Sequence, residues 1–236
     1  MIAVTFALPQ ESQDFRHALR HAGAVGEGRF LLGNIGVEEV LLGHTGVGPA
    51  AAAEKVAALL AFRRPRLLIS AGFAGGLDPR LATGDLLLAG NFSDPALLAQ
   101  SRALLRDRVF TGALTSQSRA AESVAEKAAL HRATGALGVD METASTAAVC
   151  ARAGVPLLAV RAISDPALEP LPVPFAEWFD LAAQRPRPLA LMRYLARHPA
   201  RLGPFVRFVR GLTPARHAFT RFVCDFIAAG APVFPA

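Results

Sequence analysis

The chain has 236 residues, of which 52% are hydrophobic and 19% charged, and its formal net charge is +6 at pH 7. This length and composition fit one large globular domain, with or without an appendage, and exclude wholesale disorder. No uninterrupted apolar run approaches the ~18 residues of a membrane-spanning helix, and the N-terminus lacks a basic region, so it predicts a buried strand rather than a signal peptide.

The N-terminal part of the chain predicts two strands and two helices. Residues 2–8 are apolar and predict a buried strand, and residues 11–22 predict a helix. A hairpin turn at 33–36 leads into a strand at 40–44. The turn at 45–49, TGVGP, then opens an Ala-rich helix. The exposed amides of this turn could bind an anion, or the segment could simply be a closely packed turn. The motif alone does not distinguish these alternatives.

Residues 66–71 are continuously apolar and predict a central parallel strand. The glycine-rich loop that follows, at 72–79, lets the backbone come close to a ligand. We therefore expect Phe73, Ala74 and Gly75 to lie against a substrate. The Phe73 ring either forms a pocket wall or fills the core, and the small size of the loop favours the wall.

The middle of the chain alternates strands and helices. Residues 86–89 predict a strand, 96–105 a helix, 109–114 a strand and 122–133 a polar helix with a solvated face.

The stretch 138–165 predicts a strand, a small-residue helix and a second strand, with Asp140, Glu142 and Asp165 at or just past the strand ends. Ligands of open α/β sheets bind outside the carboxyl ends of the strands, so we expect chemistry here. A proline-rich loop at 166–174 is long enough to act as a lid or wall, and 175–183 predict an amphipathic helix.

This order of elements predicts a three-layer α/β/α domain over residues 1–184 around a mostly parallel sheet. A basic helical tail is expected over 185–236, because this segment contains nine Arg and only one acidic residue, Asp225. Prolines 199, 204 and 214 predict short helices. The last helix carries an apolar stripe at Phe219, Phe222, Val223, Phe226 and Ile227. The stripe docks on the core or on a second subunit, or the tail lies on an anionic bilayer.

Three carboxylates reach one sheet edge from separate strand ends: Glu11, Glu142 and Asp165. Carboxylates that share a site shift one another's pKa values, which leaves one as a base and another as a protonated acid. This chemistry suits hydrolysis of a glycosidic bond. The alternative is that acids such as Asp140 and Asp165 are helix caps.

We expect neither a cofactor nor a metal. His17 and His21 have helical i, i+4 spacing but no third ligand nearby, and Cys150 and Cys224 lie too far apart for a metal motif or a disulfide framework. The cysteine usage predicts a reducing, cytoplasmic compartment.

Five motifs together resemble the nucleoside phosphorylase/nucleosidase superfamily, and most of all its methylthioadenosine/S-adenosylhomocysteine nucleosidases. They occur in order over residues 1–182: ALPQE (7–11), TGVG (45–48), ISAGFAGGLDPRLATGD (69–85), VDMETAS (139–145) and VRAISD (160–165).

The resemblance implies cleavage of a purine N-glycosidic bond with release of adenine. In that family the acid at Asp165 protonates the adenine, and the glutamate at Glu11 activates water. The glutamate at Glu142 binds the ribose hydroxyls with Met141 against the sugar. Arg161 and Ser164 support the carboxylates at the substrate-binding site. A homodimer is expected, and nucleic acid is not expected as a partner.

Two departures from the family pattern bear on the reaction. Phe73 replaces the Ser that phosphorylases use for phosphate, and the first strand-to-helix turn has no Arg, so water is favoured as nucleophile over phosphate. The segment 115–137 is short and has no aromatic residue to stack on adenine.

The shortened segment and the basic tail are also similar to the hopanoid-associated branch, the adenosylhopane nucleosidases. That similarity implies a lipid-linked nucleoside and a peripheral place at the inner membrane. The alternatives are phosphorolysis of a small soluble nucleoside and a non-catalytic, membrane-attached nucleoside-binding protein.

Overall fold

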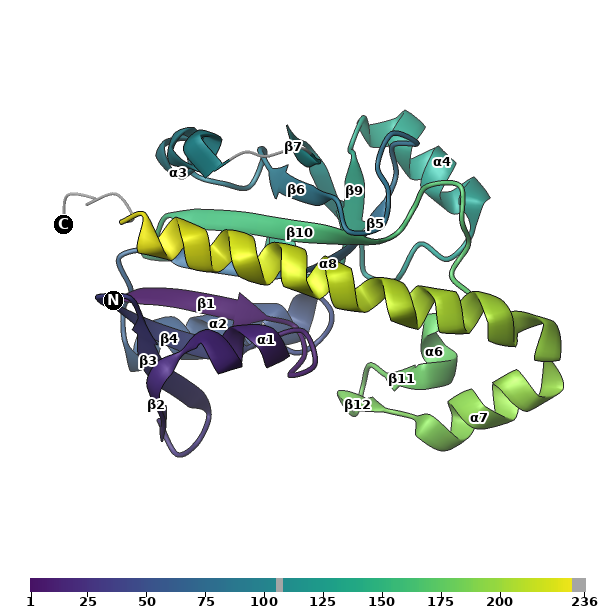
Figure 1. Ribbon diagram of the computed structural model, residues 1–236, viewed down its shortest axis with the longest axis horizontal. Coiled ribbons are helices and arrows are strands. Elements are labelled where there is room, and N and C mark those ends of the chain that lie inside the picture. Colours follow the sequence, from purple (N-terminus) through teal and green to yellow (C-terminus); the bar gives the residue numbers. More distant parts are fainter. Residues whose placement is uncertain (105–107, 231–236) are drawn as a thin grey trace.

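A mixed sheet forms the centre of the computed structural model, which describes residues 1–104 and 108–230 (Figure 1). Its strands are β1 (Ile2–Phe6), β2 (Arg20–Val25), β3 (Phe30–Ile35), β4 (Glu38–His44), β5 (Leu68–Gly76), β6 (Leu86–Ala89), β7 (Val109–Gly112), β8 (Leu114–Ser116), β9 (Gly138–Asp140) and β10 (Leu157–Asp165). The order is β2-β3-β4-β1-β5-β10-β6-β7, and β9 joins β5 while β8 joins β9. The four central strands, β4, β1, β5 and β10, run parallel, as expected.

The helices are α1 (Gln13–Ala18), α2 (Pro49–Phe62), α3 (Pro95–Ser101), α4 (Val124–Thr134), α5 (Thr143–Ala153), α6 (Phe175–Trp178), α7 (Pro188–Arg197) and α8 (Leu202–Ala228). The 3-10 turns η1 (Arg102–Leu104) and η2 (Pro199–Arg201) follow α3 and α7. A separate two-stranded ribbon consists of β11 (Phe179–Asp180) and β12 (Arg185–Pro186).

The central strands of the sheet are buried on both faces. Along β1, Ile2, Val4 and Phe6 pack in the cluster that contains α1 and α8 residues, whereas Ala3 packs in the cluster of α2 and α5 residues. This alternation follows from the two-residue period of a strand. The result is the predicted three-layer arrangement, and α8 lies across the sheet on one face (Figure 1).

The apolar stripe near the C-terminus packs on the core. Phe219, Phe222, Val223, Phe226 and Ile227 are all buried, in one cluster with residues of β1, β5 and β10. The prediction of short helices cut by prolines is wrong for α8, which continues through Pro214. Pro214 is exposed and removes one helical hydrogen bond, a loss that the packing on the sheet outweighs.

Three other predicted elements differ from the structure. The helix predicted at 11–22 ends at Ala18, because Arg20–Val25 pairs with β3 instead. The helix predicted at 175–183 stops at Trp178, and the next residues form β11. The glycines expected in a loop after residue 71 extend β5, because they pair with β10 and β9. Residue 105, the predicted end of the 96–105 helix, lies outside the described residues.

In the described ranges no helix is long and apolar enough to cross a membrane.

Candidate active site

Glu11 lies in the loop between β1 and α1, with only 7% of its surface exposed. Its Oε2 accepts a hydrogen bond from the Leu8 amide at 2.9 Å, and its Oε1 accepts one from the Phe73 amide at 3.3 Å. Burial raises the pKa of Glu11, while these amides and the positive charge of Arg161 oppose the rise. Glu11 is therefore a carboxyl whose protonation state depends closely on its neighbours.

Glu142 stands at the start of α5, directly after β9 and Met141. Its Oε1 accepts a hydrogen bond from the Gly48 amide at 2.7 Å, so the turn before α2 binds a carboxyl group that the chain itself supplies. Burial and the nearby Asp140 carboxylate raise the pKa of Glu142 to about 8, and Glu11 adds to the rise. Glu11 and Glu142 therefore lie close enough to influence each other's ionisation.

Asp165 ends β10 and is also 7% exposed. The Ser164 hydroxyl donates a hydrogen bond to its Oδ1 at 2.5 Å. The Lys127 ammonium forms an ion pair with its Oδ2 at 2.5 Å. Burial raises the pKa of Asp165, against the opposing effects of Lys127 and Ser164. The predicted proton donor is thus a buried carboxyl in contact with a cation.

Strand β5 contacts two of the carboxyl groups, each at a different glycine. A Cβ atom at Gly72 would lie 3.1 Å from Glu11 Oε1, and one at Gly75 would lie 3.2 Å from Asp165 Oδ2. Because these spaces are tighter than ordinary contact, a larger residue at either position would displace the neighbouring carboxyl group by a few tenths of an ångström. Gly72 and Gly75 are three residues apart, so the two contacts lie roughly 10 Å apart along β5.

Arg161 and Asp140 form a buried ion pair beside the carboxylates. The Arg161 Nε donates to Asp140 Oδ2 at 2.9 Å. Its other donors bind Ser70, Val160 and Thr143 at 2.7 to 3.0 Å. Protein groups engage every nitrogen of the guanidinium, which leaves Arg161 placed to orient the site and not to contact a substrate directly.

Phe73 differs from its predicted role as a pocket wall. Its ring packs edge-on against Phe219 of α8 at 5.4 Å and lies against the main core cluster. The core-filling alternative describes the ring better, because α8 covers this face of β5. The backbone of Phe73 nevertheless faces the site through its bond to Glu11.

Ala74 and Met141 are both buried in apolar clusters. Ala74 packs among residues of β6, β8 and β10, and its carbonyl accepts a hydrogen bond from Ser164 Oγ at 3.2 Å. Met141 packs with Val47 and Phe179, and this cluster also touches Leu8, Ala120, Phe175 and Trp178. Apolar side chains therefore flank the glutamate pair.

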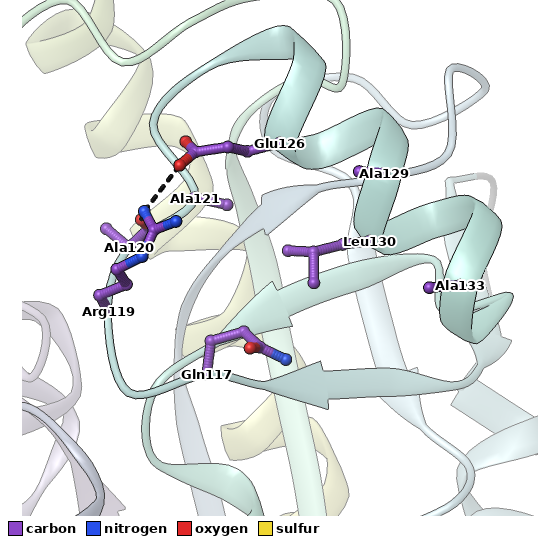
Figure 2. A pocket seen from close by; sticks show the side chains of 8 residues that line it. All are labelled: Gln117, Arg119, Ala120, Ala121, Glu126, Ala129, Leu130 and Ala133. Atoms are coloured by element: carbon purple, nitrogen blue, oxygen red, sulfur yellow. Dashed lines mark hydrogen bonds and ion pairs between the residues drawn. The ribbon is translucent and has the colours of Figure 1, made fainter.

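Two surface cavities lie near this apolar cluster. The first, of about 330 Å³, lies against α4; Figure 2 shows Leu130 on its wall and the Arg119–Glu126 ion pair at one end. The second, of about 430 Å³, is lined by Phe175, Phe179, Leu181 and Arg187, among others. Neither cavity is lined by Glu11, Glu142 or Asp165.

Lys127 and the polar groups around Asp140 were not predicted from the sequence. Residues 122–133 looked like a solvated helix, yet Lys127 is fully buried. One signal was present: Lys127 is one of only two lysines in a chain whose other basic residues are arginines. Within the described residues, no group of three His, Cys, Asp or Glu side chains is arranged to hold a metal ion.

Comparisons with known proteins give a consistent picture. The family model described as "Phosphorylase superfamily" matches residues 1–94 and 90–196. The 5'-methylthioadenosine/S-adenosylhomocysteine nucleosidase of Marinomonas sp. (strain MWYL1) is 27% identical over 66% of this chain and 80% of its own length. The enzyme of the same name from Staphylococcus epidermidis is 24% identical over 78% of this chain and 94% of its own length.

Solved structures extend the likeness to nearly the whole fold. The nucleosidase from Neisseria meningitidis, in complex with methylthio-immucillin-A, has a TM-score of 0.74 and 22% identity, covering 97% of this chain and 98% of that one. The futalosine hydrolase of Helicobacter pylori has a TM-score of 0.71 and 18% identity, covering 97% of each chain. A coverage of 97% extends well past residue 185, into the segment predicted as a tail.

Proposed function

Because this chain belongs to the phosphorylase superfamily, we propose that it hydrolyses the N-glycosidic bond of an adenosyl nucleoside and releases adenine. The main support is a set of three carboxyls: Glu11 and Asp165, which are buried and contact glycines of β5, and the half-buried Glu142, whose pKa Glu11 helps to raise. The curated relatives that carry nucleosidase names add further support.

Asp165 and Glu11 divide the proton transfers. Asp165 gives its proton to N7 of the adenine, and the electrons of the bond between C1′ and N9 move to the departing base. The sugar then has oxocarbenium character, which nearby negative charge stabilises. Glu11 accepts a proton from water as the water oxygen bonds to C1′. Glu142 accepts hydrogen bonds from the ribose hydroxyls.

Hydrolysis is favoured over phosphorolysis by the state of the amide donors. The Gly48 amide donates to Glu142 and the Phe73 amide donates to Glu11. A phosphate at either place would compete with a carboxyl group for the same amide donor. Water does not need these donors, which supports water as the nucleophile.

Release of adenine from several adenosyl compounds, with and without phosphate, tests the proposal. Asp165→Asn should lower the rate by roughly 10²- to 10⁴-fold, because the amide has no acidic proton to donate. Asp94→Asn is a matched control, since Asp94 only caps α3 and Asn caps helices equally well.

Three outcomes would contradict the proposal. Unchanged adenine release by Asp165→Asn would remove this residue from the mechanism. A phosphate requirement with ribose 1-phosphate as product would identify a phosphorylase. Binding of nucleosides without cleavage of any of them would identify a non-catalytic protein.

We further propose that the substrate carries an apolar lipid group, as adenosylhopane does, and that the protein meets it at an anionic membrane surface. The support is a surface formed by α7 and the first half of α8, which project beyond the sheet (Figure 1). Its exposed apolar residues are Leu189, Met192, Leu202, Val206 and Val209. Residues 181–224 contain no acidic residue.

The second cavity lies beside both the basic segment and the apolar cluster that contains Met141. Leu181 and Arg187 line it on the side of the basic segment. Phe179 lines it as well, and packs against Met141 beside Glu142. An apolar substituent on the nucleoside would therefore find apolar contacts from the carboxylates to the surface of α7.

Sedimentation with vesicles tests the membrane part of the proposal. The protein should pellet with vesicles that contain phosphatidylglycerol and stay in solution with vesicles of phosphatidylcholine alone, because the arginines need anionic head groups. Absence of pelleting with both, together with a dimer in solution, would assign this surface to a subunit contact.

A further inference from the structure

Lys127 is a buried cation that the proposed reaction does not use. Its side chain is 0% exposed, although α4 begins with a Ser123–Glu126 capping box that is typical of a surface helix. A desolvated ammonium is costly unless it is paired and fully hydrogen-bonded. The contacts of Lys127 therefore indicate what it does.

Among the residues that the structure describes, all close partners of the ammonium belong to the end of β10 and the next few residues. Nζ lies 2.5 Å from Asp165 Oδ2 and donates to the carbonyl oxygens of Pro166 at 2.9 Å and Glu169 at 2.7 Å. The Asp165 carbonyl oxygen is at 3.5 Å. Three hydrogens thus meet one carboxylate oxygen and two carbonyls, so the ammonium is satisfied by this segment alone.

The Asp165 carboxylate is held from both sides. Lys127 contacts Oδ2, while the Ser164 hydroxyl donates to Oδ1. The side chain rests on Gly75, where a Cβ atom would lie 3.2 Å from Oδ2. Asp165 therefore has little freedom to turn away from a bound base.

We propose that Lys127 is the positioning residue of Asp165: it aims the carboxyl and compensates the negative charge that appears there as its proton leaves. The inference rests on the proposed role of Asp165 as proton donor. When the proton moves from Asp165 to the base, the carboxylate left behind is buried, and the ammonium is the cation in contact with it. Lys127 keeps its own proton throughout.

Lys127→Met and Lys127→Arg test the proposal, with Lys55→Met as the matched control at the other lysine, which is exposed on α2. Lys127→Met should lower kcat roughly 10- to 100-fold with little change in KM, less than the loss expected on removing the acid itself. Activity requires protonated Asp165, so the alkaline limb of the pH profile should move to higher pH when the ammonium is absent. Lys127→Arg keeps the charge and should leave the limb in place.

The pKa of Asp165, followed by ¹³C NMR of the labelled carboxyl and assigned with Asp165→Asn, is a readout independent of turnover. It should rise in Lys127→Met and stay near the wild-type value in Lys127→Arg. The pKa of Asp165 can be measured even if no adenosyl compound is cleaved. The experiment therefore distinguishes failure of the proposed function from failure of this inference.

A folded Lys127→Met protein with unchanged kcat, or with an unshifted limb and an unshifted Asp165 pKa, would overturn the proposal. If Lys127→Met does not fold, Lys127→Arg decides. A wild-type alkaline limb and Asp165 pKa in that variant support the proposal, and a shift of either contradicts it.

Discussion

At the scale of single residues, Glu142 makes stability depend on pH. Its pKa rises from 4.5 to about 8 because burial and Asp140 disfavour its charged form. Between these values the folded protein holds a proton that the unfolded chain has released. The free energy of unfolding should therefore fall as the pH rises through this window, by at most about 1.4 kcal/mol per pH unit for one proton. The raised pKa values of Glu11 and Asp165 act in the same direction.

Glu142→Gln should flatten this dependence, because the amide does not titrate. Urea unfolding across the window, in wild type and variant, measures the slopes, and the slope that remains belongs to Glu11 and Asp165. Glu54→Gln on the exposed face of α2 is the control and should keep the wild-type slope. Equal slopes for wild type and Glu142→Gln would show that Glu142 ionises normally in the folded state.

Glu142 follows β9, which runs antiparallel to β5, so the rule for parallel strand ends does not place it. The positions of Glu11 and Asp165 could be predicted from the sequence, because they follow β1 and β10, parallel strands whose carboxyl ends lie at one sheet edge. The partners of these residues could not. Lys127 reaches Asp165 from a helix 38 residues earlier in the chain, and local periodicity carries no information about that contact. The predicted role of the Phe73 ring as a pocket wall was wrong for the same reason. Its neighbour Phe219 belongs to the last helix, and local sequence does not reveal a contact so distant in the chain.

At the scale of elements, α8 has two different halves. Its C-terminal half is part of the core, where Val223 is 0% exposed, while in its first half Val206 is 38% exposed. Because both residues lie on one helix, replacing each with Ala changes the helix propensity equally and isolates the effect of packing.

Val223→Ala should lower the free energy of unfolding by about 2 kcal/mol, from two lost methyl groups and the cavity they leave. Val206→Ala should change it by less than about 0.5 kcal/mol. Chemical denaturation of both variants measures the difference. Similar effects at the two positions would mean that the first half of α8 is also packed in solution.

Element boundaries were predicted best where a turn signal is strong. The TGVGP turn set the start of α2, with Pro49 in its first turn, as expected. The helix predicted at 11–22 ends at Ala18 in the structure, because pairing of the next segment with β3 outweighs the helical pattern of the sequence. Tertiary context of this kind overrides local propensity.

At the scale of the whole molecule, charge is concentrated on one part of the surface. The basic segment that holds α7 and the first half of α8 exposes apolar side chains among arginines, the composition of an interfacial helix. The remaining chain has a net charge near zero or slightly negative, so we expect attraction to an anionic surface to be directional.

Leu189→Glu combined with Met192→Glu should weaken vesicle binding by at least roughly tenfold, from lost apolar burial and added repulsion. Val37→Glu is the control, since Val37 is 99% exposed on the turn between β3 and β4, away from the basic segment. Binding should also weaken as salt is added, because screening shortens the reach of the charges to about 10 Å at 0.1 M. An equal loss in the Val37 variant would contradict a specific membrane face.

The fold class and the superfamily expected from the motifs are confirmed, because alternating elements and five ordered motifs specify them together. The role of the last helix was harder to predict. Its stripe suits a core, a partner or a bilayer equally well, and only its contacts with β5 and β10 distinguish the core from the others.

The scarcity of lysine has a practical consequence for chemistry on the intact protein. Amine-directed acylation of the folded chain reaches the N-terminus and Lys55, while the ε-amine of Lys127 stays enclosed. A mass shift on the peptide that contains Lys127 therefore reports that the segment around Asp165 has opened. The rate at which this shift appears measures the rate of opening, and no engineered probe is needed.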